Sequence, residues 1–151
     1  MRYFSNRSDE MCLWMSERLT RYSPDEFKPC STLGFVKDKR VVAGVIFNNF
    51  RPSCRDIQLT IAADSPGWMS RDSLRTIFEY VFIQLGCIRL TVSIAKKNKR
   101  ARRLAEGLGF EYEGKLRKGF DGVEDCIIYG MLHSECRWIG EKYGKVSTSR
   151  T

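Results

Sequence analysis

The sequence predicts an α/β (α+β) fold, with a mixed, mostly antiparallel twisted sheet flanked by helices. Three observations support this prediction. Several short segments alternate apolar and polar residues, as strands with one buried face do. Other segments repeat apolar residues at helical spacing. The expected order is helix, three strands, helix, strand, helix and two strands, and this mixed order favours an antiparallel sheet with helices on its faces.

A first helix is expected over residues 8–22. Ser8 is its expected N-cap, because a serine hydroxyl accepts hydrogen bonds from the unpaired amides at a helix start. The apolar stripe at helical spacing consists of Cys12, Met15, Leu19 and Tyr22. Pro24 follows closely, so the helix has to end before it.

Three strands are expected next. Those over 33–37 and 40–50 form a hairpin around residues 38–39, after a loop over 27–31. The second of these strands is apolar on both faces, which is typical of a central strand. The third covers 56–62 and ends at a turn-forming run that contains proline and glycine.

A second helix is expected over residues 71–85. Its broad apolar face consists of Leu74, Ile77, Phe78, Val81, Phe82 and Leu85. Ser70 is the expected N-cap and Gly86 the C-terminal stop. The alternating segment that follows predicts a strand over 88–94.

Residues 98–110 predict a short helix that leads back into the sheet. Asn98 is the expected N-cap, and Gly109 supplies the left-handed position at the end. The expected apolar face consists of Ala101, Leu104, Ala105 and Leu108. Two strands, over 110–116 and 126–132, close the sheet, with an Asp-Gly turn signal in their connection.

Basic residues crowd the start of this short helix: Lys96, Lys97, Lys99, Arg100, Arg102 and Arg103. Cations are disfavoured at the positive end of a helix dipole. The cluster therefore indicates either a bound anion, which helix N-termini hold well, or a solvated basic face. The net charge of +8 also favours anionic partners such as nucleic acid or phosphorylated cofactors.

The composition predicts one soluble domain. The chain has 151 residues, 42% hydrophobic and 29% charged, and we expect a domain over 1–139 followed by a polar tail over 140–151. Six cysteines without a C-x-x-C pair, and one histidine, argue against a zinc site. Charged residues interrupt the first eighteen positions, and no apolar run reaches the length of a membrane span. We therefore expect a cytoplasmic protein with free thiols and no membrane partner.

The order of elements and several short motifs resemble the GNAT superfamily of N-acetyltransferases over residues 33–132. The resemblance is closest to ribosomal-protein N-terminal acetyltransferases, which carry an Asn, a short helix, Leu-Gly-Phe and then Glu-Gly-x-x-Arg. Here these are Asn98, Leu108-Gly109-Phe110 and Glu113-Gly114-Lys115-Leu116-Arg117. The run that starts at Glu124 and ends at Tyr129 resembles the closing strand of that branch. Similar small proteins occur in bacterial and phage genomes.

The resemblance implies acetyl-CoA as the cofactor, held where two central strands splay apart. The pantetheine arm would pair with the backbone of Thr60, Ile61, Ala62 and Ala63. The pyrophosphate would lie on the amides of Trp68, Met69, Ser70, Arg71 and Asp72, although Trp68 stands where the family usually has glycine. Asn98 would contact the cofactor arm, and Arg102 the nucleotide phosphates. Without the resemblance, residues 60–63 would be interpreted as an ordinary core strand end.

The implied reaction is acetyl transfer to a primary amine in a ternary complex, the acceptor being a protein N-terminus, a lysine or a small amine. Asp56 matches the glutamate base of some family members and would act through water, while a solvated strand-end aspartate is the alternative interpretation. Asp125 and Glu124 are competing carboxylates. Backbone amides of residues 61–63 would stabilise the oxyanion.

The general acid has no clear counterpart in this sequence. The family places a tyrosine at the position of Ala105 and, in the ribosomal branch, a serine at the position of Ala101. Tyr112 and Tyr129 remain as hydroxyl donors, but a strand tyrosine usually packs. Two other classes of function therefore stay open: a GNAT-fold protein that binds or modifies nucleic acid, and a non-catalytic CoA-binding module. The expected oligomeric state is a monomer or a homodimer.

Overall fold

The computed structural model describes residues 2–19 and 22–139. The strands are β1 (Arg2–Phe4), β2 (Cys30–Lys37), β3 (Arg40–Arg51), β4 (Asp56–Ala63), β5 (Arg89–Ala95), β6 (Glu111–Leu116) and β7 (Cys126–Leu132). The α-helices are α1 (Ser8–Arg18), α2 (Arg71–Glu79) and α3 (Lys99–Leu108). Shorter helical turns are η1 (Pro24–Phe27), η2 (Pro66–Trp68), η3 (Tyr80–Gln84) and η4 (His133–Glu135). The expected tail and positions 20–21 of the first predicted helix lie outside the described residues.

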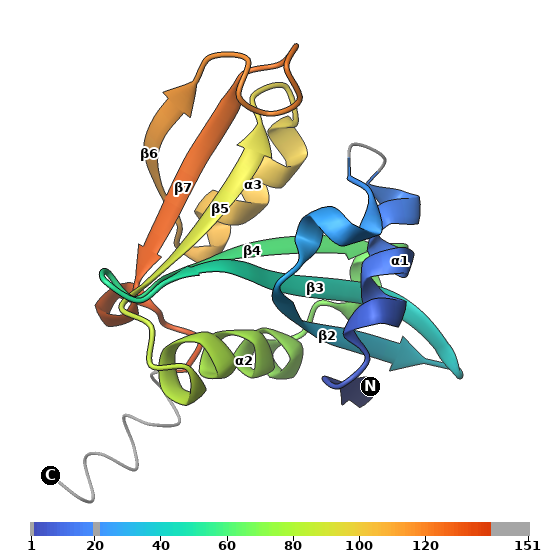
Figure 1. The fold of residues 1–151 in the computed structure, drawn as a ribbon. Helices are drawn as coiled ribbons and strands as arrows, with labels where there is room; N and C mark the ends of the chain where they lie inside the picture. The colour runs from blue at the N-terminus through green and yellow to red at the C-terminus, as the bar shows by residue number, and fades with distance from the viewer. Residues whose placement is uncertain (1, 20–21, 140–151) are drawn as a thin grey trace, which may run out of the picture.

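The seven strands form one sheet in the order β1-β2-β3-β4-β5-β7-β6. Every neighbouring pair is antiparallel except β4 and β5, which run parallel. The predicted fold class is confirmed. Figure 1 shows the sheet as two groups of strands that meet at one end and diverge toward the other.

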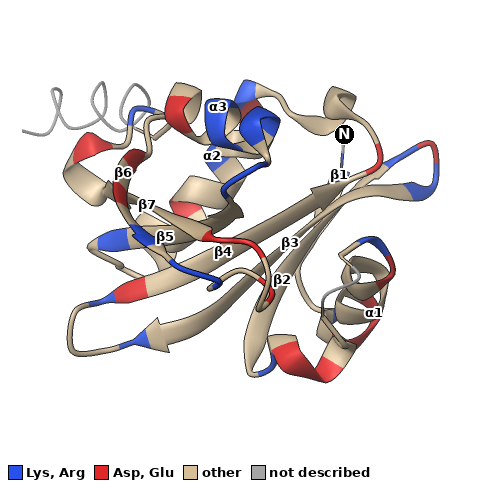
Figure 2. Ribbon diagram, turned by 90° about the horizontal axis from the view of Figure 1, so that it is seen from above, with Lys and Arg blue, Asp and Glu red and all other residues tan. Residues whose placement is uncertain are grey.

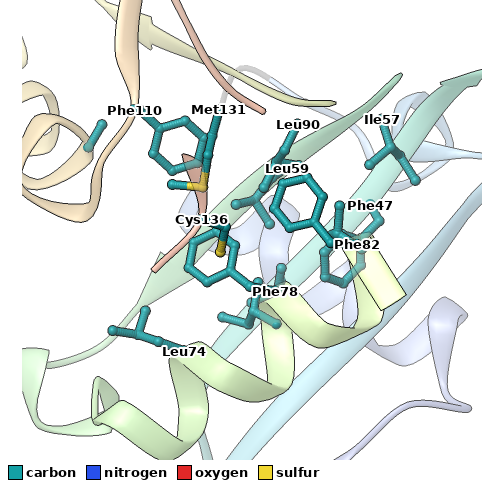
Figure 3. Packing of buried hydrophobic residues seen from close by; sticks show 14 of the residues in the cluster. Phe47, Ile57, Leu59, Leu74, Phe78, Phe82, Leu90, Phe110, Met131 and Cys136 are labelled. Carbon is teal, nitrogen blue, oxygen red and sulfur yellow. The ribbon is translucent and has the colours of Figure 1, made fainter. Parts of the chain in front are cut away.

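Helix α2 covers one face of the sheet and makes the larger core. Its apolar side chains point toward those of the central strands, as Figure 3 shows for Phe78 and Phe82 near Phe47 and Leu90. Each of these four side chains is at most 2% exposed. Burying one such side chain contributes about 1.5–3 kcal/mol, so this layer fixes α2 against the sheet.

Helix α1 covers the opposite face at a point where the sheet carries no side chains. Gly34 of β2 and Gly44 of β3 lie directly opposite each other in the hairpin. A Cβ at Gly44 would collide with the side chains of Met11 and Met15, and one at Gly34 with the ring of Phe4. The glycine pair therefore lets α1 approach the sheet closely.

The second predicted helix and both of its end signals are confirmed. The Ser70 hydroxyl accepts from the amide of Ser73 at 3.1 Å, as an N-cap does. The last turn widens, so that the amide of Leu85 donates to the carbonyl of Tyr80 at 2.8 Å. Gly86 then takes a positive φ of 69°, which ends the helix.

Helix α3 and its neighbours are also confirmed, with one correction. Asn98 caps the helix by accepting from the amide of Ala101 at 3.1 Å, and Gly109 ends it with a φ of 113°. Leu104, expected on the buried face, is 43% exposed. Ala105 is the buried residue of α3, so a narrower face than expected meets the sheet.

Three boundaries near the N-terminus differ from expectation, the first being the end of α1, which lies at Arg18 rather than at Tyr22. The N-cap position of α1 is Arg7 rather than Ser8, and no side chain caps this helix. Strand β2 begins at Cys30, within the expected loop, because it pairs with β3 as far as Asn48. Among the described residues, no helix is both long and apolar enough to cross a membrane.

Candidate active site

The central feature of the candidate site is the parting of β4 from β5. The two strands pair at three positions only, which are Asp56 with Arg89, Ile57 with Leu90 and Gln58 with Thr91. Beyond them β4 stays paired with β3 as far as Ala63, and β5 stays paired with β7 as far as Ala95. The sheet therefore divides into two arms, one that contains β4 and one that contains β5 (Figure 1). On their facing edges, the backbone groups of β4 and β5 do not hydrogen-bond to each other. Such an edge can pair with an extended ligand.

The four residues predicted to bind the pantetheine arm all lie on the diverging part of β4. Thr60, Ile61, Ala62 and Ala63 follow the last pair with β5. Ala63 is exposed and Ala62 buried, because Ala62 packs in the small core beneath α1. The pairing of β3 with β4 carries a register shift, which lies between Asn48 and Arg51 of β3.

The turn between β4 and α2 holds the predicted pyrophosphate site, and the unexpected tryptophan there points inward. Trp68 is 2% exposed, and its ring lies 5.2 Å from that of Phe35 between centroids. Its carbonyl accepts from the buried hydroxyl of Ser73 at 2.9 Å. The bulky side chain therefore anchors the turn in the core, and it does not cover the backbone on the outer side of the turn.

Two of the five amides expected to hold the pyrophosphate are used inside the turn. The amide of Met69 donates to the carbonyl of Pro66 at 3.1 Å, and that of Ser70 to the hydroxyl of Ser73 at 2.8 Å. These two amides therefore have acceptors within the protein, and the predicted set of donors stays a prediction. Arg71 and Asp72, both exposed, begin α2, and first-turn amides have no carbonyl acceptor within their own helix.

Asn98 and Arg102 lie on the other arm, at the start of α3. Asn98 is exposed and uses its Oδ1 atom as the cap. The Arg102 Nε donates to the Tyr129 hydroxyl at 3.1 Å, and its Nη1 to the carbonyl of Lys96 at 3.1 Å. Arg102 therefore ties α3 to β7, and these two contacts use Nε and Nη1 but not Nη2.

Tyr129, a candidate acid, is enclosed between the sheet and α3. Its hydroxyl donates to Oε2 of Glu106 at 2.7 Å, and the residue is fully buried. Burial raises the pKa of Tyr129, while the hydrogen bond from Arg102 opposes the shift. Tyr112 is 56% exposed and meets the edge of the Tyr129 ring. Tyr129 therefore has a structural role, and the solvent-facing tyrosine of the pair is Tyr112.

Asp56 lies where β4 and β5 are still paired, at the closed end of the splay. Its side chain is 3% exposed. It accepts from Arg51 Nη2 at 3.1 Å, Arg89 Nε at 3.2 Å and the Thr91 hydroxyl at 2.7 Å. A general base needs an oxygen that faces the acceptor, and the three donors occupy this carboxylate. The geometry therefore favours a positioning role over the base predicted from the sequence.

Glu113 continues this group of charges, and nothing in the sequence beyond the family motif pointed to it. The Arg89 guanidinium that holds Asp56 also binds Glu113, with Nη2 to Oε1 at 2.5 Å and Nη1 to Oε2 at 3.3 Å. Glu113 reaches across β7 above Gly130, where a Cβ would collide with its carboxylate. Its side chain is 36% exposed, against 3% for Asp56, so Glu113 is the carboxylate of the pair that meets solvent.

The competing carboxylates lie away from the closed end. The side chain of Glu124 accepts from the amide of Lys97 at 3.2 Å, and that of Asp125 from the amide of Lys118 at 2.9 Å. Both therefore shape the connection between β6 and β7, beyond the ends of the strands.

The fold is shared with solved acetyltransferases. A spermidine N-acetyltransferase of Vibrio cholerae, SpeG, aligns with a TM-score of 0.72 and 16% identity, covering 94% of this chain and 99% of that one. A provisionally described acetyltransferase of T. thermophilus aligns with a TM-score of 0.62 and 23% identity, covering 72% of this chain and 61% of that one. The chain thus shares its fold with these acetyltransferases, in agreement with the fold that the sequence resemblance implied.

Sequence comparison adds a partial relative. The chain is 35% identical over 71 residues to YdaF of Bacillus subtilis (strain 168), provisionally named a ribosomal N-acetyltransferase. The match covers 45% of this chain and 38% of the relative. No protein-family model matches the sequence.

Proposed function

We propose that the protein is an N-acetyltransferase that transfers the acetyl group of acetyl-CoA to a primary amine. The observation that carries the proposal is the parting of β4 from β5 after three paired residues. Two capped helix starts, at Ser70 and Asn98, follow the two diverging strands in the chain. Helix starts attract phosphates, and a free strand edge matches the amides of an extended pantetheine arm.

The residues present fit the cofactor. Thr60, Ile61, Ala62 and Ala63 offer the backbone edge, and the first turn of α2 at Arg71 and Asp72 offers amides for the pyrophosphate. Asn98 and the remaining Nη2 of Arg102 supply polar groups on the opposite arm. When bound, acetyl-CoA supplies an acetyl group activated as a thioester, and amides of residues 61–63 would stabilise the negative charge that develops on its oxygen.

The acceptor amine is assigned to the face that carries Glu113. Side chains alternate along a strand, and Ala62 of β4 packs beneath α1, so Asp56, Gln58 and Thr60 lie on that same face. Glu113 is bound to Arg89 on this face. Its carboxylate attracts a protonated amine, and a water between them relays the proton that the amine loses to this carboxylate before the amine attacks.

Asp56 has the role of a positioning residue in this proposal. Asp56 holds the Arg89 guanidinium in place, and the guanidinium in turn holds the Glu113 carboxylate in position. The acceptor remains a class rather than a molecule: a protein N-terminus, a lysine or a small amine. The names of the relatives motivate a panel that contains spermidine and peptides with free N-termini.

Calorimetry with acetyl-CoA, followed by mass spectrometry of the amine panel, tests the proposal. We expect binding of acetyl-CoA and an acetylated product from at least one class of amine. Glu113→Gln should raise the KM for the amine while leaving acetyl-CoA binding unchanged. Glu111→Gln is the matched control, because Glu111 is exposed on the same strand and outside the charged group.

The outcomes separate the alternatives. Absence of acetyl-CoA binding at millimolar concentration would overturn the proposal. Tight binding without transfer to any amine would instead support a non-catalytic CoA-binding module.

A further inference from the structure

Eight basic side chains form an exposed surface at one edge of the molecule, which we call the basic rim. Five come from the turn before α3 and from α3 itself, where Figure 2 shows Lys and Arg gathered. Three come from the end of β6 and the residues after it. The basic rim consists of Lys96, Lys97, Lys99, Arg100, Arg103, Lys115, Arg117 and Lys118, all exposed.

Backbone hydrogen bonds hold the two parts of the basic rim together. The amide of Lys96 donates to the carbonyl of Asp125 at 3.0 Å, and the amide of Lys118 donates to the side chain of the same residue at 2.9 Å. That amide, and then the charges of Lys115, Lys96 and Arg117, hold the pKa of Asp125 below its usual range. Cations from both parts, Lys96 from one and Lys115 and Arg117 from the other, therefore act on a single aspartate.

The positive charge of the basic rim is not balanced within the described chain. None of its eight side chains has a carboxylate within the 4.0 Å of an ion pair among residues 2–19 and 22–139. The two nearby acids, Glu124 and Asp125, are occupied with backbone amides. Like charges at close range repel one another, so a surface of this kind favours an external polyanion.

We propose that the basic rim binds nucleic acid through the phosphates of a single strand. The charges are spread over two separate segments and all face solvent, which suits a row of phosphates better than one small anion. A shallow hollow of about 730 Å³, lined by residues 115–118 and Asp125, lies among them. This hollow is open to solvent, so it offers a bound strand no obstruction beside the phosphate contacts.

The cofactor does not account for the part of the basic rim that comes from β6 and the residues after it. The residues assigned to acetyl-CoA lie on β4, at the start of α2 and at Asn98 and Arg102, whereas Lys115, Arg117 and Lys118 come from β6 and the residues after it. A membrane surface fits less well than a nucleic acid. Surface helices insert an apolar face beneath their cations, whereas α3 exposes one large apolar side chain, Leu104, and the cations at the end of β6 flank one more, Leu116.

Charge-removing variants test the proposal in the full chain. The rim variant carries Lys115→Gln, Arg117→Gln and Lys118→Gln. The control carries Lys37→Gln, Lys39→Gln and Arg40→Gln, three exposed cations of the β2–β3 hairpin. The two variants are matched, because each loses three charges and each contains one position with positive φ, 54° at Lys118 and 64° at Lys39.

Binding is measured by fluorescence anisotropy with a labelled single-stranded RNA of about twenty nucleotides, titrated between about 50 and 200 mM salt. We expect the rim variant to lower the slope of log affinity against log salt by about two units, since each phosphate contact on a single strand contributes about 0.7. The control should keep the slope of the original protein. Both variants should retain acetyl-CoA affinity by calorimetry, whether or not the protein transfers acetyl groups.

Three results would overturn the proposal. One is absence of RNA binding at the lowest salt. Another is an equal loss in the rim variant and the control, which would show that only net charge matters. The third is binding to vesicles of anionic lipid that the rim variant loses, without binding to RNA.

Discussion

Gly130→Ala tests how Glu113 reaches the closed end of the splay. β7 lies between β5 and β6, so Glu113 has to extend across β7 to meet Arg89. A Cβ at position 130 would occupy the place of the Glu113 carboxylate. The displaced group is the far end of a flexible side chain, so we expect the glutamate to move rather than the backbone.

The expected cost is that of the two hydrogen bonds between Arg89 and Glu113. Bonds between charged groups contribute about 1.5–3 kcal/mol when buried, and exposed ion pairs contribute less than about 1 kcal/mol. The Arg89 side chain is 24% exposed and that of Glu113 36%, so solvent screens the pair in part. We therefore expect a loss of about 1–2 kcal/mol in the free energy of unfolding, measured by urea denaturation.

Gly114→Ala is the control for this measurement. Gly114 lies in β6, and a Cβ there would meet no atom within 4 Å. Because both changes replace a strand glycine by alanine, their effects on the unfolded chain cancel. If Gly130→Ala were no less stable than Gly114→Ala, the steric argument would be refuted. Under the proposed function, Gly130→Ala should also raise the KM for the amine, as Glu113→Gln does, with little change in acetyl-CoA affinity.

Three further outcomes are expected. Ser73→Ala removes the hydroxyl that bonds the turn before α2, and it should cost about 1–2 kcal/mol of stability and weaken acetyl-CoA binding by calorimetry. The hydrogen bond from Arg18 holds the pKa of Asp64 below its ordinary value of 3.8. The stabilisation from this pair is therefore present above pH 3.8 and is lost as the pH falls below that value. In thermal melts from pH 5 to pH 3, the melting temperature should fall less in Asp64→Asn than in the original protein. The sulfur atoms of Cys12 and Cys30 lie 3.5 Å apart. Hydrogen peroxide should oxidise Cys30 to a sulfenic acid, which the Cys12 thiol then converts to a disulfide with release of water. Peptide mapping should find this disulfide before any other.

The sequence predicted best those features that depend on local chemistry. Ser70 and Asn98 were identified as caps because a polar residue stood directly before an amphipathic run, and the structure confirms both. Gly86 and Gly109 were identified as stops for the same kind of reason, and both have positive φ. The hairpin at residues 38–39 and the closing strand over 126–132 were also predicted, and both are present.

Features that depend on contacts across the sheet could not be predicted. Asp56 looks like any strand-end aspartate until Arg51 of β3 and Arg89 and Thr91 of β5 are brought around it. The inward direction of Trp68 depends on Phe35, which lies far away in the sequence. The cofactor contacts remain predictions, because they follow from the family resemblance and from the geometry of backbone groups.

The charged group at Asp56 offers a physical reason why β4 and β5 can part without the sheet separating. Beyond the closed end, β4 and β5 no longer pair with each other, but β4 stays paired with β3 and β5 with β7. Backbone pairing between β4 and β5 therefore consists of three residue pairs at the closed end. Arg89 adds a bridge there, since it binds Asp56 on β4 and Glu113 on β6 from its own place on β5. The same guanidinium therefore locks the two arms together at their closed end and presents the carboxylate assigned to the acceptor amine. A substitution that frees Arg89 should consequently affect the stability of the sheet and the recognition of the amine together, whereas the cofactor contacts at the open end should be left intact.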